Sequence, residues 1–356
     1  MQKGSGVIQS ALIGAGLIAQ QHLACVSKLP GVRLAGICDL SRALAESAAE
    51  RYGAAAWFTD HQRMLTEVRP DIVHITTPPA SHFRLAQDCL NAGAHVFVEK
   101  PATARFEEFR VLRSLAEAKR KWLVEDYNSL YYAPVRRLLE WVQKGVLGDT
   151  VHVEATLCLN VLEKNNPFAD LNLRHSALEL EGGVIADFLP HLASLAYFLC
   201  GPVRSVRTVW DRRARSSPLP YDEFRAVLRG ERATATLLFS AHSQPDLFRL
   251  TVFGSRARAT ADIYENRLTC ASMRPVPKPL IPFYNALEEA KVIRHSAWKL
   301  LWQKLGSGPG TYQGMWTLIA RVYEAVGSGS PPPFSLEDTF EVNRLVDELR
   351  KDANRV

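Results

Sequence analysis

The first 125 residues alternate between short apolar segments typical of β-strands and segments with helical periodicity. This alternation limits the fold more than any other feature of the sequence. Strands buried on both faces are apolar throughout, and the helices between them form the crossovers of a parallel sheet. We therefore predict an α/β region with strands at residues 9–13, 32–38, 54–58, 71–76, 95–98 and 122–124 and helices at 17–28, 41–52, 82–92 and 106–120.

The first predicted strand ends in Gly14-Ala15-Gly16-Leu17-Ile18-Ala19, which has the form G-x-G-x-x-A. In such a turn the first glycine allows a tight bend, and the second lets the backbone approach a pyrophosphate. The helix that follows offers free N–H groups to the phosphates. The turn thus predicts a dinucleotide bound by Gly14, Gly16, Leu17 and Ile18. A purely structural turn is the weaker alternative.

Asp39 ends the second predicted strand, 39 − 14 = 25 residues after Gly14. An acid about 20 residues after the glycines accepts hydrogen bonds from the adenosine ribose and disfavours a 2′-phosphate. Asp39 therefore favours NAD over NADP, although NADP stays open. Arg42 either contacts the cofactor, including a 2′-phosphate, or is an ordinary surface residue.

The pattern changes after about residue 130, where a helix at 132–144 precedes longer strands joined by short turns. Strands in immediate succession indicate an antiparallel sheet. We expect strands at residues 151–159, 203–210, 224–228, 234–240, 249–253 and 259–263, then helices at 283–305, 312–326 and 337–351. The predicted domains are residues 1–128, which bind the dinucleotide, and 129–356, an α+β domain. Packing of the last helix, 337–351, back on the first domain stays open.

Two further motifs carry chemistry. Val98-Glu99-Lys100-Pro101 closes the fifth predicted strand, and ligands of parallel sheets bind outside the carboxyl ends of the strands. Asp187 and His191 stand at i and i+4 ahead of an apolar helix, where they share a face if the turn is helical. An aspartate beside a histidine orients the imidazole for proton transfer. In isolation the first motif is more typical of an ordinary charge pair at a strand end, and the second of a helix-capping aspartate with a packed histidine.

Together these motifs resemble the glucose–fructose oxidoreductase, inositol dehydrogenase and rhizopine-catabolism (Gfo/Idh/MocA) family. The resemblance rests on the glycine turn, residues 76–82 (TTPPASH), Glu99-Lys100-Pro101, and Gly182-Gly183 followed by Asp187 and His191. It implies a Rossmann domain followed by a domain with a large, mostly antiparallel sheet that commonly forms an oligomer interface. The resemblance implies Lys100, Asp187 and His191 as catalytic residues and Thr77, Pro78, His82, Glu99, Lys100 and Asn128 as cofactor neighbours.

Parts of the chain depart from the family pattern. Pro190 lies between Asp187 and His191, and it weakens the i, i+4 argument if the helix begins well before Asp187. Residues 160–181 match no pattern and are expected to shape the substrate pocket. Arg174 and His175 in this segment, and Tyr312 after a glycine linker, are therefore candidate substrate contacts.

Composition excludes several classes of protein. The net charge of +6 and the pI near 9.0 come from arginines spread along the chain without an RNA-binding signature, so we expect no nucleic-acid partner. No leader or membrane segment is recognised, and we expect a cytoplasmic protein. The six cysteines form no C-x-x-C pair and have no histidine at a metal-ligand spacing, so no metal is expected.

The sequence therefore predicts an NAD(P)-dependent oxidoreductase that acts on a hydroxyl or carbonyl of a sugar, cyclitol, sugar acid or nucleotide sugar. A homo-oligomer, dimer or tetramer, is expected from the family. Two alternatives stay open: a glycosidase that uses transient oxidation by NAD, and a dinucleotide-binding regulator without catalysis. The exact substrate, the reaction direction and the choice between His191 and Lys100 as main proton acceptor are not fixed by the sequence.

Overall fold

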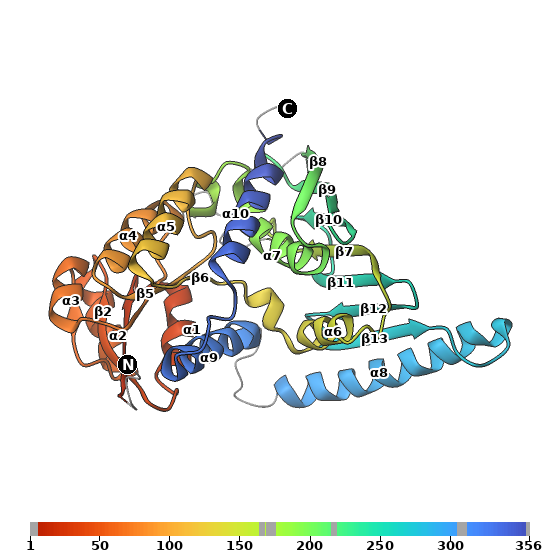
Figure 1. The fold of residues 1–356 in the computed structure, drawn as a ribbon, viewed down its shortest axis with the longest axis horizontal. Helices are drawn as coiled ribbons and strands as arrows, with labels where there is room; N and C mark the ends of the chain where they lie inside the picture. Colours follow the sequence, from red (N-terminus) through yellow and green to blue (C-terminus); the bar gives the residue numbers. More distant parts are fainter. Residues whose placement is uncertain (1–5, 164–167, 169–175, 215–218, 305–311, 354–356) are drawn as a thin grey trace. The chain divides into compact units, whose positions relative to one another are not determined.

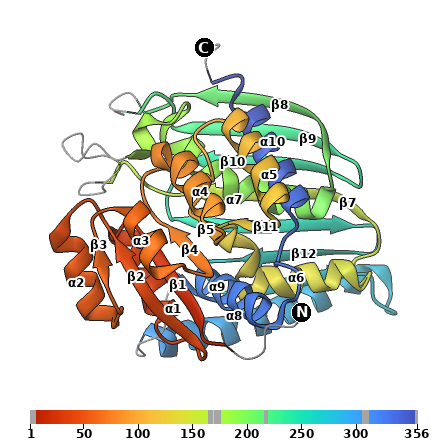
Figure 2. The ribbon, with the colours of Figure 1, turned by 60° about the vertical axis from the view of Figure 1, so that its left-hand side comes forward.

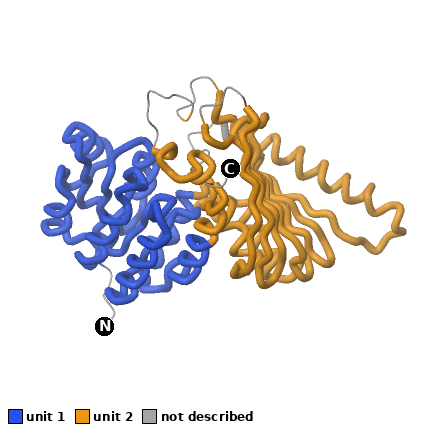
Figure 3. Tube along the Cα trace, turned by 90° about the horizontal axis from the view of Figure 1, so that it is seen from above, with its two compact units in different colours: residues 1–127, 315–344 blue, residues 128–314, 345–356 orange. Residues whose placement is uncertain are grey.

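The computed structural model describes residues 6–163, 168, 176–214, 219–304 and 312–353. The chain forms two compact units, residues 1–127 with 315–344 and residues 128–314 with 345–356 (Figure 3). The first unit ends at Tyr127, and the sequence places the division after residue 128. Residues 315–344 also belong to the first unit. The sequence leaves such a return open for the last helix, 337–351, and does not predict it for the residues before that helix.

The first unit is built on a six-stranded parallel sheet, sheet A, with the strand order β3-β2-β1-β4-β5-β6. The order reverses between β1 and β4, which is where doubly wound sheets bind their ligands. The strands are β1 (Ile8–Ile13), β2 (Val32–Cys38), β3 (Trp57–Phe58), β4 (Ile72–Ile75), β5 (His95–Val98) and β6 (Leu123–Glu125).

Helices cover both faces of sheet A (Figure 1). One face packs against α3, α4 and α5 in an apolar core that includes Met64, Cys89 and Leu112. The other face carries α1 and α9, whose His22 and Tyr323 both contact His74 of β4. The helices of this unit are α1 (Leu17–Val26), α2 (Arg42–Tyr52), α3 (His61–Val68), α4 (His82–Asn91), α5 (Phe106–Lys119), α9 (Gln313–Ser328) and the first part of α10 (Leu336–Arg350).

The second unit is built on a seven-stranded sheet, sheet B, with the order β13-β12-β11-β7-β10-β9-β8 (Figure 2). Its neighbouring strands run antiparallel except for β7 and β10, which are parallel. The strands are β7 (Thr150–Cys158), β8 (Val203–Asp211), β9 (Glu223–Gly230), β10 (Thr234–Ser240), β11 (Leu247–Gly254), β12 (Ala257–Asp262) and β13 (Arg267–Ser272).

Helix α7 (Gly183–Cys200) packs on sheet B against β7, β9 and β10. Among the described residues, α7 is the one helix long and apolar enough to cross a membrane, but 83% of it is buried inside the protein. Such burial is typical of a core helix. The unit also contains α6 (Ala133–Gln143), next to β12 and β13, and α8 (Ile281–Lys304), which packs along β13.

The predicted mixture of a parallel sheet and a mostly antiparallel sheet is confirmed. Three elements differ from the prediction. Helix α3 and strand β13 were not expected, and α7 begins at Gly183 and not after His191. Helix α3 has only eight residues, which makes its periodicity hard to detect, and a pair such as Gly182-Gly183 is more typical of a turn than of the start of a helix.

Candidate active site

The glycine turn after β1 has an open approach. Gly14 has a φ of +96°, and a β-carbon there would lie 2.6 Å from Cγ2 of Thr77. Gly16 is the N-cap of α1, no side chain caps the helix, and a β-carbon at Gly16 would meet nothing within 4 Å. The first N–H groups of α1 are therefore free to bind an anion. This geometry fits a dinucleotide pyrophosphate held by the turn.

Asp39 ties the end of β2 to the glycine turn. One carboxylate oxygen accepts a hydrogen bond from the Ala15 N–H at 2.7 Å, and the other accepts one from the Ser41 N–H at 2.8 Å. The neighbouring residues are accessible, since Leu40 is 95% exposed and Leu17 is 85% exposed. Exposed apolar side chains beside an acid that follows β2 are suited to an adenosine moiety.

Arg42 lies at the start of α2 and is engaged within the protein. Its guanidinium stands 5.0 Å from the Trp57 ring centre and 3.5 Å from the Glu46 carboxylate. The side chain of Arg42 is 71% exposed, so these contacts leave it accessible to a cofactor. A cation stacked on Trp57 at this strand end keeps NADP open as a cofactor alongside NAD.

The turn after β4 contains Thr77 and Pro78, with the short helix η1 (Pro79–Ser81) behind them. His82 is fully buried and places its two ring nitrogens 2.9 Å from the Pro101 carbonyl and 2.7 Å from the Thr77 carbonyl. His82 therefore links the turns that follow β4 and β5 and supports Thr77 and Pro101. Its place next to the cofactor stays a prediction.

At the tip of β5, Glu99 is buried and Lys100 is partly exposed. The Glu99 carboxylate accepts hydrogen bonds from His22 Nε2 at 3.0 Å and from the Lys100 N–H at 3.2 Å. Burial raises the pKa of Glu99, but the hydrogen bond from His22 and the nearby Lys100 outweigh it, so the pKa lies below its ordinary value. Glu99 is therefore ionised.

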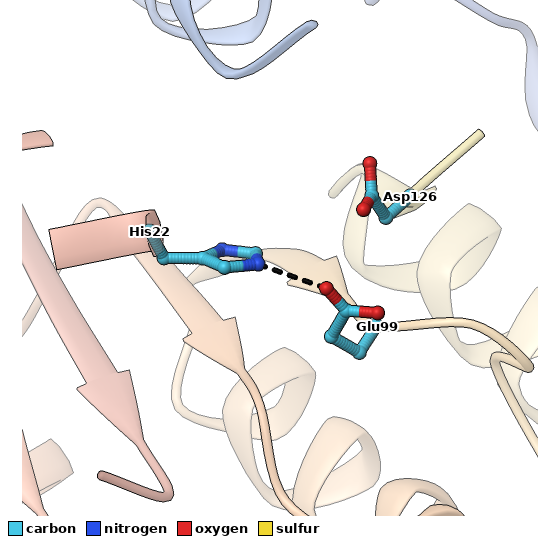
Figure 4. A group of neighbouring side chains, drawn as sticks. All are labelled: His22, Glu99 and Asp126. Carbon is cyan, nitrogen blue, oxygen red and sulfur yellow. Dashed lines mark hydrogen bonds and ion pairs between the residues drawn. The ribbon is translucent and has the colours of Figure 1, made fainter. Parts of the chain in front are cut away.

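His22, Glu99 and Asp126 bring three potential metal-ligand atoms within 4.8 Å of one another (Figure 4). The ring of His22 is already engaged on both sides, since Nε2 bonds to Glu99 and Nδ1 lies 2.9 Å from Nδ1 of His74. We interpret this group as part of a hydrogen-bonded cluster and assign it no metal.

A second buried carboxyl group lies near Lys100. Glu125, at the end of β6, accepts hydrogen bonds from Tyr127 Oη and Asn343 Nδ2, both at 2.7 Å. Burial raises the pKa of Glu125 to about 7, while these bonds and the charge of Lys100 act in the opposite direction. The sequence alone does not identify Glu125, His22 and His74 as candidate site residues, because their positions in apolar strands and helices are typical of the core.

In the second unit, Asp187 and His191 lie on α7 at i and i+4, which places them on one face. Asp187 is buried, His191 is partly buried, and the His191 ring lies beside Phe188 and Phe248. Because α7 begins at Gly183, Pro190 falls inside the helix and not in its first turn, so it cannot donate to the Ala186 carbonyl. Pro190 therefore interrupts the helical bonding, which is the case in which the i, i+4 argument for Asp187 and His191 is weaker.

The remaining predicted residues have different outcomes. Asn128 opens the short helix η2 (Asn128–Tyr131) in the second unit, and a β-carbon at Gly314 would lie 2.5 Å from its carbonyl oxygen. Tyr312 is 38% exposed, so it is accessible to a ligand. Arg174 and His175 lie outside the described residues.

Two family models match this chain. The model described as an oxidoreductase family with an NAD-binding Rossmann fold matches residues 8–127, and a C-terminal domain model of Gfo/Idh/MocA proteins matches residues 135–260. Together they cover more than half of the chain.

Among curated proteins, the chain is similar to glycosyl hydrolase family 109 protein 2 of Akkermansia muciniphila, with 36% identity over 159 residues. It is also similar to D-glucoside 3-dehydrogenase of Escherichia coli K12, with 33% identity over 146 residues. The matches cover 42% and 41% of this chain and 34% and 42% of those proteins, so the chain spans about a third to two fifths of their length.

A solved structure shares the fold over nearly the whole chain. It is the WlbA dehydrogenase of Bordetella pertussis in complex with NADH and UDP-GlcNAcA. The TM-score is 0.79 at 18% identity, and the match covers 98% of this chain and 96% of that one. At this identity the likeness establishes the fold alone.

Proposed function

Because the chain belongs to the Gfo/Idh/MocA oxidoreductase family, we propose that it transfers hydride between NAD and a ring carbon of a sugar-like substrate. The observation that carries the proposal is the uncapped start of α1 at Gly16, with Asp39 at the adjoining strand end and Lys100 at the tip of β5. Gly14, Gly16 and Asp39 would hold the dinucleotide. When bound, NAD supplies the hydride acceptor.

The residues of the chain then have separate tasks. His191 accepts the proton of the substrate hydroxyl, and Asp187 orients the imidazole and stabilises its charged form. Lys100 donates a hydrogen bond to the reacting oxygen and stabilises the negative charge that develops on it. This division gives the proton to His191, and the phenylalanines around its ring favour a defined orientation.

The substrate class follows from the named relative. D-glucoside 3-dehydrogenase is named for dehydrogenation of D-glucosides at position 3, so D-glucosides are the first substrates to test, followed by cyclitols, sugar acids and nucleotide sugars. NAD⁺ and NADP⁺ reduction are measured by absorbance across this panel. We expect turnover with NAD⁺ on at least one pyranoside, and binding of NAD without turnover on any compound would contradict the proposal.

Two variants test the assigned roles. Lys100→Ala and His191→Ala are each expected to lower kcat by about 10²–10⁴-fold while leaving NAD affinity within a few-fold of the native value. Arg42→Ala is the control for kcat, because Arg42 belongs to the adenosine side of the proposed cofactor site and not to the reacting groups. Full turnover by either catalytic variant with the true substrate would contradict the scheme.

The second candidate function is NAD-dependent glycoside cleavage, favoured by the similarity to a protein named as a glycosyl hydrolase. Transient oxidation of the ring would allow the aglycone to leave by elimination, after which the hydride returns. Release of the aglycone without net formation of NADH distinguishes this reaction from dehydrogenation. The third alternative, a regulator without catalysis, predicts neither released aglycone nor NADH.

We further propose a cytoplasmic homo-oligomer, a dimer or tetramer. Val209 of β8 and Val227 of β9 are 62% and 58% exposed on sheet B, which suits them to contact another copy. Light scattering coupled to gel filtration measures the molar mass, and a monomer at micromolar concentration would contradict this part of the proposal.

A further inference from the structure

Five side chains of the first unit form a continuous buried chain of hydrogen bonds. The chain runs from Ser10 of β1 through Tyr323 of α9, His74 of β4 and His22 of α1 to Glu99 at the tip of β5. The successive distances are 2.5, 2.9, 2.9 and 3.0 Å. Each of the five residues is at most 7% exposed.

Glu99 determines the direction of every bond in this chain. A carboxylate only accepts, so His22 Nε2 donates to it, and a neutral His22 must then accept at Nδ1. His74 donates from its own Nδ1 to His22 and accepts at Nε2 from the Tyr323 hydroxyl. Ser10 in turn donates to the Tyr323 oxygen. All four donors therefore point toward Glu99.

The charge states of the intermediate residues agree with this direction. Burial, together with the nearby His22, lowers the pKa of His74 well below its ordinary value, so the ring is neutral and carries one N–H. Burial raises the pKa of Tyr323 above its ordinary value, so the hydroxyl keeps its proton. A neutral His74 between two partners has one donor and one acceptor, and the chain uses both.

The chain ends where the proposed chemistry begins. Glu99 accepts a hydrogen bond from His22 Nε2 on one oxygen and from the Lys100 backbone N–H on the other, so its carboxylate joins the buried chain to the Lys100 turn. We propose that His22, backed by His74 and Tyr323, is a positioning residue that keeps Glu99 ionised and oriented beside Lys100 during the reaction. This inference rests on the proposed function for its role in turnover.

Every charged group around Glu99 bears on the expected pH dependence. Burial raises its pKa, and the hydrogen bond from His22 opposes burial more strongly than Lys100 or His82 does. The Asp126 carboxylate lies within 4.8 Å of the Glu99 and His22 ligand atoms, and its negative charge disfavours ionisation of Glu99. Without His22 the pKa of Glu99 rises, and activity that needs the carboxylate is lost at a higher pH than in the native protein.

The experiment compares variants of the full chain. His22→Met removes both ring contacts, while His22→Gln keeps one donor and one acceptor. Tyr323→Phe removes only the hydroxyl at the far end of the chain. Cys25→Ala, a buried residue on the same helix but outside the chain, controls for loss of packing. Each variant is checked for a cooperative thermal transition and for NAD binding.

Two readouts are followed against pH. The first is the acid limb of kcat/KM, and the second is the infrared carboxyl band of Glu99, identified by its loss in Glu99→Gln. In His22→Met both are expected to move to higher pH by about one unit or more. His22→Gln and Cys25→Ala should match the native profile. Tyr323→Phe should move in the same direction as His22→Met, by a smaller amount.

The outcomes separate this inference from the proposed function. If no pyranoside is turned over, the infrared titration still tests whether His22 holds Glu99 ionised. The inference is overturned if Glu99 titrates alike in folded His22→Met and native protein, or if His22→Gln shifts as far as His22→Met. If His22→Met does not fold, an unshifted Glu99 titration in Tyr323→Phe overturns it. If the infrared band shifts while the acid limb of an active enzyme does not, the role in turnover is wrong.

Discussion

At the scale of single residues, the two glycines of the glycine turn after β1 have different structural surroundings. Gly14 has a left-handed φ and faces Thr77, so any side chain there disturbs the turn itself. Gly16 has a φ of −74° and open space where a β-carbon would be, so the protein alone tolerates alanine at this position. The packing of the described residues gives no reason for glycine at this second position, whereas the proposed approach of a dinucleotide to the backbone does.

This difference leads to a paired prediction. Gly16→Ala should leave the free energy of unfolding within about 1 kcal/mol of the native value but weaken NAD binding at least about tenfold, because the methyl group occupies the approach to the helix amides. Gly14→Ala should lower stability by about 1–3 kcal/mol as well as abolish binding. Thermal melting and NAD titration check both. Unchanged NAD affinity in Gly16→Ala would place the dinucleotide elsewhere.

Glu125 makes a prediction about pH. Its pKa of about 7 in the folded protein exceeds the ordinary value of about 4.3 expected for the unfolded chain. The folded protein therefore holds a proton that the unfolded chain releases between these pH values, so stability falls as the pH rises through this window and levels off above pH 7. The contribution is at most about 4 kcal/mol.

Glu125→Gln cannot ionise and should remove this slope. Urea denaturation of the native protein and the variant between about pH 4 and pH 8 isolates the contribution as the difference between the two profiles. If the free energies of unfolding of the native protein and the variant change in parallel with pH, Glu125 is already ionised in the folded protein at neutral pH.

At the scale of elements, α7 depends on the glycines at its start. Gly182 has a φ of +91°, and a β-carbon there would lie 2.8 Å from the ring of Trp210, which is itself buried and donates to the Leu349 carbonyl. The position of α7, and with it Asp187 and His191, thus depends on the close approach of Gly182 to β8.

Gly182→Ala should therefore cost both stability and activity. We expect a loss of about 2–3 kcal/mol and a fall in kcat at nearly constant NAD affinity, because the helix that carries His191 shifts. Gly53→Ala is the control, since Gly53 has a φ of +70° with open space around it and bears only the conformational cost. A native kcat in folded Gly182→Ala would show that the placement of the proposed catalytic residues does not depend on the start of α7.

The sequence predicts those elements whose pattern repeats, and it misses those fixed by packing. The apolar strands of sheet A and the glycine turn are visible because period and turn chemistry agree. The extension of α7 through Pro190 is not, because tertiary packing holds a helix that local preference would interrupt. Likewise, His22 and Tyr323 lie 301 positions apart in the sequence, with His74 between them. All three resemble core residues until the fold brings them together.

At the scale of the whole molecule, the first unit is completed by the far end of the chain. Residues 315–344 return to sheet A, and α9 contributes Tyr323 to the buried hydrogen-bonded chain. Asn343 of α10 donates to Glu125. The N-terminal segment therefore lacks part of its core and two buried polar partners when it stands alone.

A fragment of residues 1–127 is accordingly expected not to fold cooperatively. Leaving His74 and Glu125 buried without these partners costs about 1–3 kcal/mol each, and one face of sheet A loses the apolar cover of α9. Near-ultraviolet circular dichroism and thermal melting measure the result. A sharp transition with native NAD affinity would show that the return of the chain is dispensable.

The central claim is that a hydride on a substrate ring carbon moves directly to NAD held by this chain. The most direct measurement uses a pyranoside deuterated at the ring carbons and determines the mass of the nicotinamide after turnover. With the native protein we expect deuterium in the reduced nicotinamide, and with His191→Ala about 10²–10⁴-fold less over the same time. Reduced nicotinamide that carries no deuterium would contradict it.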